Sequence, residues 1–191
     1  MNEEQKNERA TNIEVLVINA QEGDRDAFSR IYDLMVEPVY KYVYYRVNVS
    51  DVEDIVENIF LRVWEHLRQY KPQKSFSAWV FRIAHNMIVD YYRASRDRDV
   101  LVLDPHVPDE NRQHNPIKNT QDALHGDVLR KAIAILKKPY RDIIIYKFIN
   151  ELSNKEIADI MGKNEGSLRI LQFRALKALK RELINMGFNV T

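Results

Sequence analysis

Residues 152–183 read LSNKEIADIMGKNEGSLRILQFRALKALKREL. Ser153 and Glu156 are spaced as a capping box, which predicts that a helix begins here. Gly162 can adopt left-handed backbone angles, so this helix is expected to end at the glycine. Asn164 is suited to cap a second, longer helix. Two capped helices joined by a tight glycine turn are typical of a helix-turn-helix that reads DNA.

The second of these helices separates into two faces at about 100° per residue. Its packing face comprises Leu168, Leu171, Ala175, Leu179 and Glu182. The opposite face places Ile170 and Phe173 among basic side chains, and such a mixture suits a major groove, where thymine methyl groups lie beside guanine edges. The alternative is a solvated amphipathic helix whose Phe173 packs on a neighbouring element. The predicted DNA-reading residues are Arg169, Ile170, Phe173, Arg174 and Lys177.

Charge is strongly segregated along the chain, although its net charge is only +1. Residues 1–71 carry a net charge of −5 and residues 72–98 one of +3. Residues 99–126 carry −3 and residues 127–191 carry +6. Two basic blocks separated by acidic ones suggest two nucleic-acid surfaces on one chain.

The composition also argues against several classes of protein. Cysteine is absent, which excludes a disulfide framework or a thiolate metal site and fits a reducing cytosol. No two histidines have metal-ligand spacing on one helix, and neither a catalytic triad nor a glycine-rich phosphate loop can be identified. The N-terminus lacks the apolar core of a signal peptide, and no apolar run is long enough to span a bilayer. We therefore expect a cytoplasmic protein that is not an enzyme, uses no metal or cofactor, and does not insert into membranes.

Helical periodicity predicts an all-α chain with two small domains joined by a flexible linker. The first domain is expected at residues 13–98, after a disordered tail at 1–12, and the second at residues 124–191. Between them, residues 99–123 are acidic and rich in proline and asparagine, the composition of a linker. In the first domain Pro38 is expected near the start of a separate helix, because proline is tolerated in a first helical turn.

The sequence predicts two further helices, at residues 51–70 and 75–96, and leaves two alternative roles open for each. The apolar face predicted for the first consists of Ile55, Ile59, Phe60, Val63, Trp64 and Leu67. Its carboxylates are either simply solvated or part of an interface. The apolar face predicted for the second consists of Phe76, Trp79, Val80, Ile83, Ala84, Met87 and Ile88. Its increasingly basic edge fits either a solvated helix end or contact with exposed bases and phosphates.

Four stretches together resemble a known family. INAQEGDRDAFSRIYDLMVEPVYKYVYYRV (residues 18–47), DVEDIVENIFLRVWEHLRQY (51–70) and SFSAWVFRIAHNMIVDYYR (75–93) are similar to the second conserved domain of bacterial sigma factors. LRKAIAILKKPYRDIIIYKFINELSNKEIADIMGKNEGSLRILQFRALKALK (129–180) is similar to their fourth domain. With these two domains and a short linker, the chain resembles the extracytoplasmic-function group of the sigma-70 family.

The resemblance implies a dissociable subunit that lets core RNA polymerase find and melt a promoter. Its implied partners are core RNA polymerase, promoter DNA as duplex and as non-template single strand, and an anti-sigma factor. The residues implied to bind core polymerase are Asp51, Asp54, Glu57, Asn58 and Arg62. Those implied to hold the unpaired strand of the −10 element are Tyr70, Lys74, Phe76, Arg82, Asn86 and Arg93. The second helix of the helix-turn-helix is implied to read the −35 element, and the linker to pass near the RNA exit path.

Two positions depart from the family pattern. Glu57-Asn58 stands where relatives often have a glutamine and an acidic residue, and Ile170-Leu171 replaces a common small-polar and basic pair. Ile170 on the groove face should favour thymine methyl groups, so the −35 sequence cannot be copied from relatives. One rival reading is a helix-turn-helix repressor or activator that binds duplex DNA unaided. A second is a signalling module whose helices bind only proteins.

Overall fold

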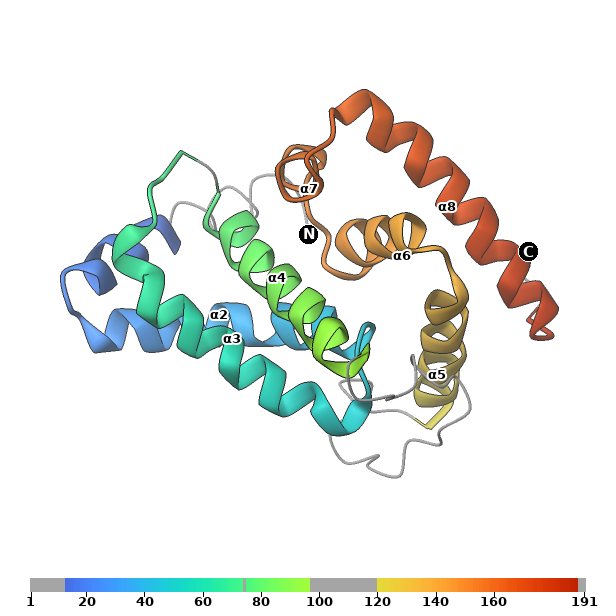
Figure 1. Ribbon diagram of the computed structural model, residues 1–191, viewed down its shortest axis with the longest axis horizontal. Helices are drawn as coiled ribbons and strands as arrows, with labels where there is room; N and C mark the ends of the chain where they lie inside the picture. Colours follow the sequence, from blue (N-terminus) through green and yellow to red (C-terminus); the bar gives the residue numbers. More distant parts are fainter. Residues whose placement is uncertain (1–12, 74, 97–119, 189–191) are drawn as a thin grey trace.

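The computed structural model describes residues 13–73, 75–96 and 120–188. The predicted tail, Lys74, residues 97–119 and residues 189–191 lie outside this part of the chain, so most of the linker predicted at residues 99–123 is not described. Every regular element of the described residues is helical, which confirms the all-α prediction (Figure 1). We refer to residues 13–96 as the N-terminal half and to residues 120–188 as the C-terminal half.

The N-terminal half begins with a helix at residues 13–21. Gly23, at φ +105°, turns the chain, and the Asp24 carboxylate accepts the backbone N–H groups of Asp26 and Ala27 to start α2, Arg25–Tyr44. A short 3₁₀ turn at Val49–Asp51 leads into α3, Val52–His66, and a second one, Leu67–Gln69, ends it. Ser75 caps α4, Phe76–Arg96, by accepting the N–H of Ala78. Helices α2, α3 and α4 pack on one another around a common apolar core.

The prediction that Pro38 begins a separate helix is wrong, because α2 runs through it without a break. Proline removes one backbone donor from a helix interior and normally kinks or ends the helix. Here Met35 and Val39, on either side of the proline, are both buried, as are Tyr42 and Val43 further along. Burial of this continuous apolar stripe keeps the two segments in one helix.

Trp64 is also placed differently from its prediction. It is 42% exposed, although its spacing assigned it to the buried side of α3. Its ring meets that of Phe28 edge to face, with centroids 4.6 Å apart, above the core rather than in it. Val52 and Val56 take the buried positions that sequence periodicity overlooked.

The C-terminal half contains α5, Thr120–Ile135; α6, Lys138–Ile144; α7, Asn154–Met161; and α8, Glu165–Asn185. Pro139 lies in the first turn of α6, where proline is tolerated, and a π-helical turn, Ile145–Ile149, follows this helix. The first of these helices begins inside the segment predicted to be linker. α8 packs along α6 and α5, while α7 meets its N-terminal part.

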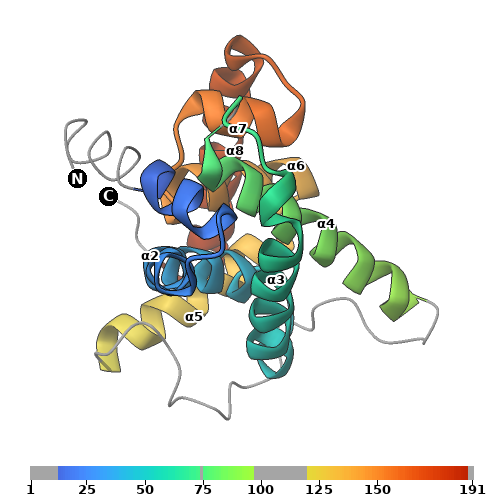
Figure 2. The same cartoon turned by 90° about the vertical axis from the view of Figure 1, so that its left-hand side faces the viewer.

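The two halves lie against each other (Figure 1). α7 packs beside the beginning of α4, and the π-helical turn contacts α2. Turning the molecule by 90° keeps α7 beside the N-terminal end of α4 (Figure 2). Among the described residues, none of the helices is long and apolar enough to cross a membrane.

Candidate nucleic-acid interface

The helix-turn-helix forms as its capping residues predict. The Ser153 hydroxyl accepts the N–H of Glu156 at 3.2 Å, and the Glu156 carboxylate accepts the N–H of Ser153 at 2.9 Å. Gly162 ends α7 in the left-handed conformation, at φ +63°. Asn164 then caps α8 by accepting the N–H of Ser167 at 2.8 Å. These bonds satisfy backbone groups that helix ends otherwise leave unpaired, so the turn between the helices is well defined.

Packing and one polar bond fix the angle between α7 and α8. Ile157 of α7 and Leu168 of α8 are fully buried in the same core. The Gln172 amide of α8 donates to the amide oxygen of Asn154 at the start of α7, at 2.9 Å. The second helix is therefore held rigidly with one face outward.

The outward face of α8 is the one that the sequence predicted. Its five predicted reading residues are all exposed: Arg169, Ile170, Phe173, Arg174 and Lys177. Phe173 is 71% exposed and Ile170 57% exposed. The alternative in which Phe173 packs on a neighbouring element is therefore wrong. Two large apolar side chains remain accessible beside three cations, which is the chemistry needed for thymine methyl groups, guanine edges and phosphates.

The residues predicted to hold the −10 strand fall into two groups. Three of them, Arg82, Asn86 and Arg93, are exposed on α4. Asn86 follows Arg82 by about one helical turn, and Arg93 follows Asn86 by about two. Tyr70 and Phe76 are only 6% and 1% exposed. The Lys74 position lies outside the described residues.

Tyr70 and Phe76 therefore do not present the ring faces that base stacking requires. Their rings lie at 89° to each other, with centroids 5.3 Å apart, and both adjoin Trp79. Burial of this aromatic cluster removes apolar surface from water, so these two residues hold the end of α3 against the start of α4. We therefore reassign Tyr70 and Phe76 from the strand-binding surface to the core of the N-terminal half. Trp79, half-buried at the cluster's edge, is the more accessible ring.

The predicted polymerase-binding residues lie on α3 and at its start. Asp54, Glu57, Asn58 and Arg62 are exposed along the helix. Asp51 differs, because its carboxylate accepts the Tyr91 hydroxyl at 2.6 Å and the Ser50 hydroxyl at 2.9 Å. Burial and the bond to Asp51 raise the pKa of Tyr91, which keeps it a neutral donor. Asp51 thus ties α4 to the start of α3.

A groove between α2 and α3 was not predicted from the sequence. It is lined by Phe28, Tyr32, Val36, Tyr40, Glu53, Val56, Glu57, Phe60, Leu61 and Trp64. Its floor is aromatic, since the rings of Tyr32 and Phe60 have centroids 4.6 Å apart. Leu61 is 55% exposed beside it. Exposed apolar surface of this kind, with carboxylates at its edge, is typical of a docking site for another protein.

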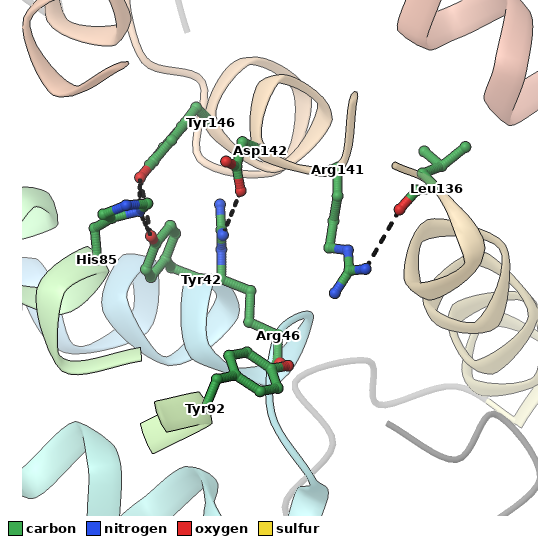
Figure 3. A network of polar contacts seen from close by, with 8 residues as sticks. All are labelled: Tyr42, Arg46, His85, Tyr92, Leu136, Arg141, Asp142 and Tyr146. Atoms are coloured by element: carbon green, nitrogen blue, oxygen red, sulfur yellow. Dashed lines mark hydrogen bonds and ion pairs between the residues drawn. The ribbon is translucent and has the colours of Figure 1, made fainter. Parts of the chain in front are cut away.

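A buried polar cluster joins the two halves (Figure 3). The Arg46 guanidinium of the N-terminal half pairs with the Asp142 carboxylate of the C-terminal half at 2.6 Å. The hydroxyl oxygens of Tyr42 and Tyr146 are 2.9 Å apart, and His85 Nδ1 lies 3.4 and 3.3 Å from them. Arg46 also lies over the Tyr42 ring, 4.2 Å from its centroid. These partners are far apart in the sequence, so sequence periodicity carries no signal for the cluster.

Burial shapes the proton equilibria of this cluster. It raises the pKa of Tyr42, an effect that the positive charge of Arg46 partly offsets. It lowers the pKa of His85, and Arg46 lowers it further. The imidazole is therefore neutral at pH 7 and can hydrogen-bond one tyrosine hydroxyl through an unprotonated nitrogen.

The His85 shift predicts that acid weakens the fold. Because the pKa of His85 is lower in the folded chain than in the unfolded one, the unfolded chain binds more protons as the pH falls below about 6.5. The free energy of unfolding should therefore decrease more steeply between pH 7 and pH 5.5 in the wild type than in His85→Asn. Urea denaturation at several pH values measures this. Parallel slopes for the two proteins would contradict the assignment.

Fold and surface together define an all-helical protein that carries a helix-turn-helix with an exposed basic and apolar face, and a second helix upstream with exposed basic side chains. Two family models match the chain: Sigma-70 region 2 over residues 31–98 and Sigma-70 region 4 over residues 126–179. The chain belongs to the sigma-70 family of RNA polymerase sigma factors, and its relatives place it in the extracytoplasmic-function (ECF) group.

Two curated relatives illustrate the match. The chain is 34% identical over 170 residues to the ECF RNA polymerase sigma factor BldN of Streptomyces coelicolor. This match covers 88% of this chain but only 64% of that protein. It is 28% identical over 180 residues to the ECF RNA polymerase sigma factor SigW of Bacillus subtilis, covering 85% of this chain and 92% of that protein. The chain thus spans somewhat less than two thirds of the first relative's length.

Two solved structures share the fold. CnrH in complex with the cytosolic domain of CnrY superimposes with a TM-score of 0.71 at 20% identity, covering 91% of this chain and 98% of that one. RpoE in complex with the anti-sigma factor NepR from Bartonella quintana gives a TM-score of 0.66 at 19% identity, covering 82% and 96%. At these identities the likeness concerns the fold.

Proposed function

We propose that this chain is a dissociable sigma subunit, which binds core RNA polymerase and directs it to promoters with defined −10 and −35 elements. The observation that carries the proposal is the open face of α8 in a fully capped helix-turn-helix, where Arg169, Ile170 and Phe173 are exposed together. Membership of the sigma-70 family supports the −35 duplex as the partner of that face. The chain has no catalytic role of its own in this account, since the chemistry of RNA synthesis belongs to the polymerase.

In this proposal residues 13–98 form the domain that docks on polymerase and handles the −10 element, and residues 124–191 form the domain that reads the −35 element. The acidic segment between them passes near the RNA exit path. Polymerase binding uses the exposed side chains of α3 and the neighbouring groove, where Glu53 and Glu57 flank the aromatic floor. An apolar surface with an acidic edge suits a partner helix that is amphipathic and basic.

We also propose that an anti-sigma factor regulates the chain in the cytoplasm. The support is that two structures with the same fold were solved in complex with a cytosolic domain or an anti-sigma factor. The exposed apolar side chains of the groove and of α8 are accessible to such a protein as well as to polymerase and DNA.

Transcription by reconstituted polymerase tests the proposal. Core RNA polymerase alone and core polymerase with this chain are compared on templates from the source genome. Transcripts that begin at defined sites only when the chain is present would support the sigma assignment. Duplex binding by the isolated chain, with no such transcripts, would instead favour a stand-alone repressor or activator.

Arg169→Ala should weaken recognition of one −35 base pair. A bidentate contact from arginine to a guanine contributes about 1–3 kcal/mol of discrimination against other bases. Binding of the holoenzyme to promoters with each −35 position randomised measures the effect. An equal loss of binding for all sequences would show that Arg169 contacts a phosphate instead.

Asn86→Ala should slow strand opening while leaving closed-complex binding nearly unchanged. The Asn86 amide is exposed on α4 and can hydrogen-bond an unpaired base, and such a bond forms only once the duplex is open. Permanganate reactivity of promoter thymines follows the opening. Opening at the wild-type rate would remove Asn86 from the strand-binding surface.

A further inference from the structure

The centre of the exposed face of α8 is apolar rather than charged. At about 100° per residue, Ile170 and Phe173 lie next to each other on this face, with Arg174 beyond the first and Arg169 beyond the second. The two apolar side chains are 57% and 71% exposed, although apolar surface is unfavourable in water. Single exposed apolar side chains are common, but two neighbouring ones between cations point to a ligand that is itself partly apolar.

Within residues 166–177, all of which the structure describes, α8 exposes no amide and no carboxylate. Asparagine and glutamine are the side chains that pair with adenine, and carboxylates accept from the amino group of cytosine. Gln172 is half-buried and donates to Asn154 Oδ1 at 2.9 Å, so it holds α8 against α7 instead of facing a groove. Glu165 is exposed in the first turn of the helix, but at the edge of the face, on the Arg169 side.

Gly166 leaves the same face open one turn before Ile170. Its φ lies outside the left-handed region, and a Cβ at this position would meet only Asn164 Oδ1, at an ordinary contact distance of 3.5 Å. Neither backbone conformation nor lack of space therefore requires a glycine, and glycine weakens a helix. Its missing side chain does allow another molecule to approach the backbone closely. Because helical side chains lean toward the N-terminus, Ile170 leans over this open position, where no side chain of residue 166 shields it.

The apolar group that bases offer in the major groove is the C5-methyl group. Thymine carries it, and cytosine acquires the same group at the same position when it is methylated. Ile170 and Phe173 are about 4.5 Å apart along the helix axis, close to the roughly 3.4 Å between stacked base pairs. Each side chain can therefore meet a methyl group on its own base step, while Arg169 and Arg174 are placed for guanine edges or phosphates on either side.

We infer that Ile170 and Phe173 read C5-methyl groups at two neighbouring steps of the −35 duplex, and that 5-methylcytosine is accepted there in place of thymine. Promoters with cytosine at these steps are therefore used more strongly once that cytosine is methylated. The inference rests on the proposed sigma function and deepens it, because it names the chemical group that is recognised and a DNA modification that regulates recognition.

Uracil tests the inference, because it pairs as thymine does and lacks only the methyl group. The probe is a promoter found by reconstituted transcription, prepared with each −35 thymine of either strand replaced in turn by uracil. Competition binding should show that the loss of one methyl contact weakens holoenzyme binding about three- to fivefold at one or two neighbouring steps. At those steps a C5-methylated cytosine–guanine pair should bind more tightly than the unmethylated pair by the same factor.

Variants of α8 assign the effect to particular side chains. Ile170→Ser should bind the thymine and uracil duplexes equally at one step and retain the difference at the other. Phe173→Ser should remove the difference at that other step. Ile184→Ser is the matched control, because Ile184 is 52% exposed on the same helix, about 21 Å further along. It should preserve both differences.

The uracil series requires no variant, so it remains informative if a substitution impairs folding. Promoter-specific transcription with holoenzyme binding that is unchanged by uracil at every −35 thymine would overturn methyl reading and leave the sigma function intact. Differences that persist in both Ile170→Ser and Phe173→Ser would overturn it as well. Equal binding of methylated and unmethylated cytosine would overturn the exchange of 5-methylcytosine for thymine. Absence of promoter-specific transcripts, seen before any modified duplex is made, would count against the sigma function itself.

Discussion

Arg46→Met is expected to destabilise the contact between the two halves by about 3–5 kcal/mol, because Asp142 would stay buried without its counter-ion. Separation of the halves returns Asp142 to water, so the variant should unfold in two steps where the wild type unfolds in one. Both tryptophans, Trp64 and Trp79, lie in the N-terminal half. Fluorescence therefore follows that half alone, while circular dichroism follows all helices. The two urea curves should coincide for the wild type and diverge for Arg46→Met.

Two controls accompany this prediction. Arg62→Met removes an arginine that is 61% exposed, and such surface changes alter stability by only about 0.5 kcal/mol. Arg46→Met combined with Asp142→Leu replaces the ion pair with apolar side chains and should bring the two curves together again, since such replacements are often neutral or stabilising. Coincident curves and an unchanged midpoint in Arg46→Met alone would contradict the buried ion pair.

Ile157→Ala is expected to lower the free energy of unfolding by about 2–5 kcal/mol. Ile157 of α7 is fully buried in the common apolar core, and its truncation leaves a cavity beneath the helix-turn-helix. The orientation of α8 depends on this contact, so transcription from promoters that need the −35 element should decline more than transcription from promoters with a strong −10 element. Calorimetry and paired transcription reactions measure the two effects.

Ala158→Gly provides a comparison on the same helix, since it costs only about 1 kcal/mol through helix propensity. A loss of stability in Ile157→Ala no greater than that of Ala158→Gly would show that α7 is held mainly by its polar caps. Equal declines from both promoter classes would show that the substitution acts on overall folding rather than on −35 reading.

The helix-turn-helix could be predicted almost completely from the sequence, because its signals are local. Ser153, Glu156, Gly162 and Asn164 each act within one turn of the backbone they cap, and each behaves as expected. The exposed reading face of α8 followed from periodicity in the same way. Local hydrogen bonds and a 3.6-residue repeat are readable in a single sequence without knowledge of the rest of the fold.

Features that depend on distant partners could not be predicted in this way. Tyr70 and Phe76 have the ring chemistry for stacking on bases, but α3 and α4 bring them together in the core. Pro38 signals a helix start locally, yet burial on both sides of it maintains one helix. Arg46 and Asp142 are 96 residues apart, and neither has a local pattern that points to the other. Tertiary packing determines the environment of each of these residues, and sequence periodicity carries no information about tertiary packing.

Start-site sequencing of reconstituted transcription can show whether this chain directs polymerase to promoters through α8 and α4, as we propose. Core polymerase with the wild-type chain is predicted to produce transcripts whose start sites share one upstream −10 and −35 pair. When Arg169→Ala replaces the wild-type chain, the transcripts should keep the same −10 sequence but show a weaker base preference at one −35 position. Start sites identical to those of core polymerase alone would contradict the proposed sigma function.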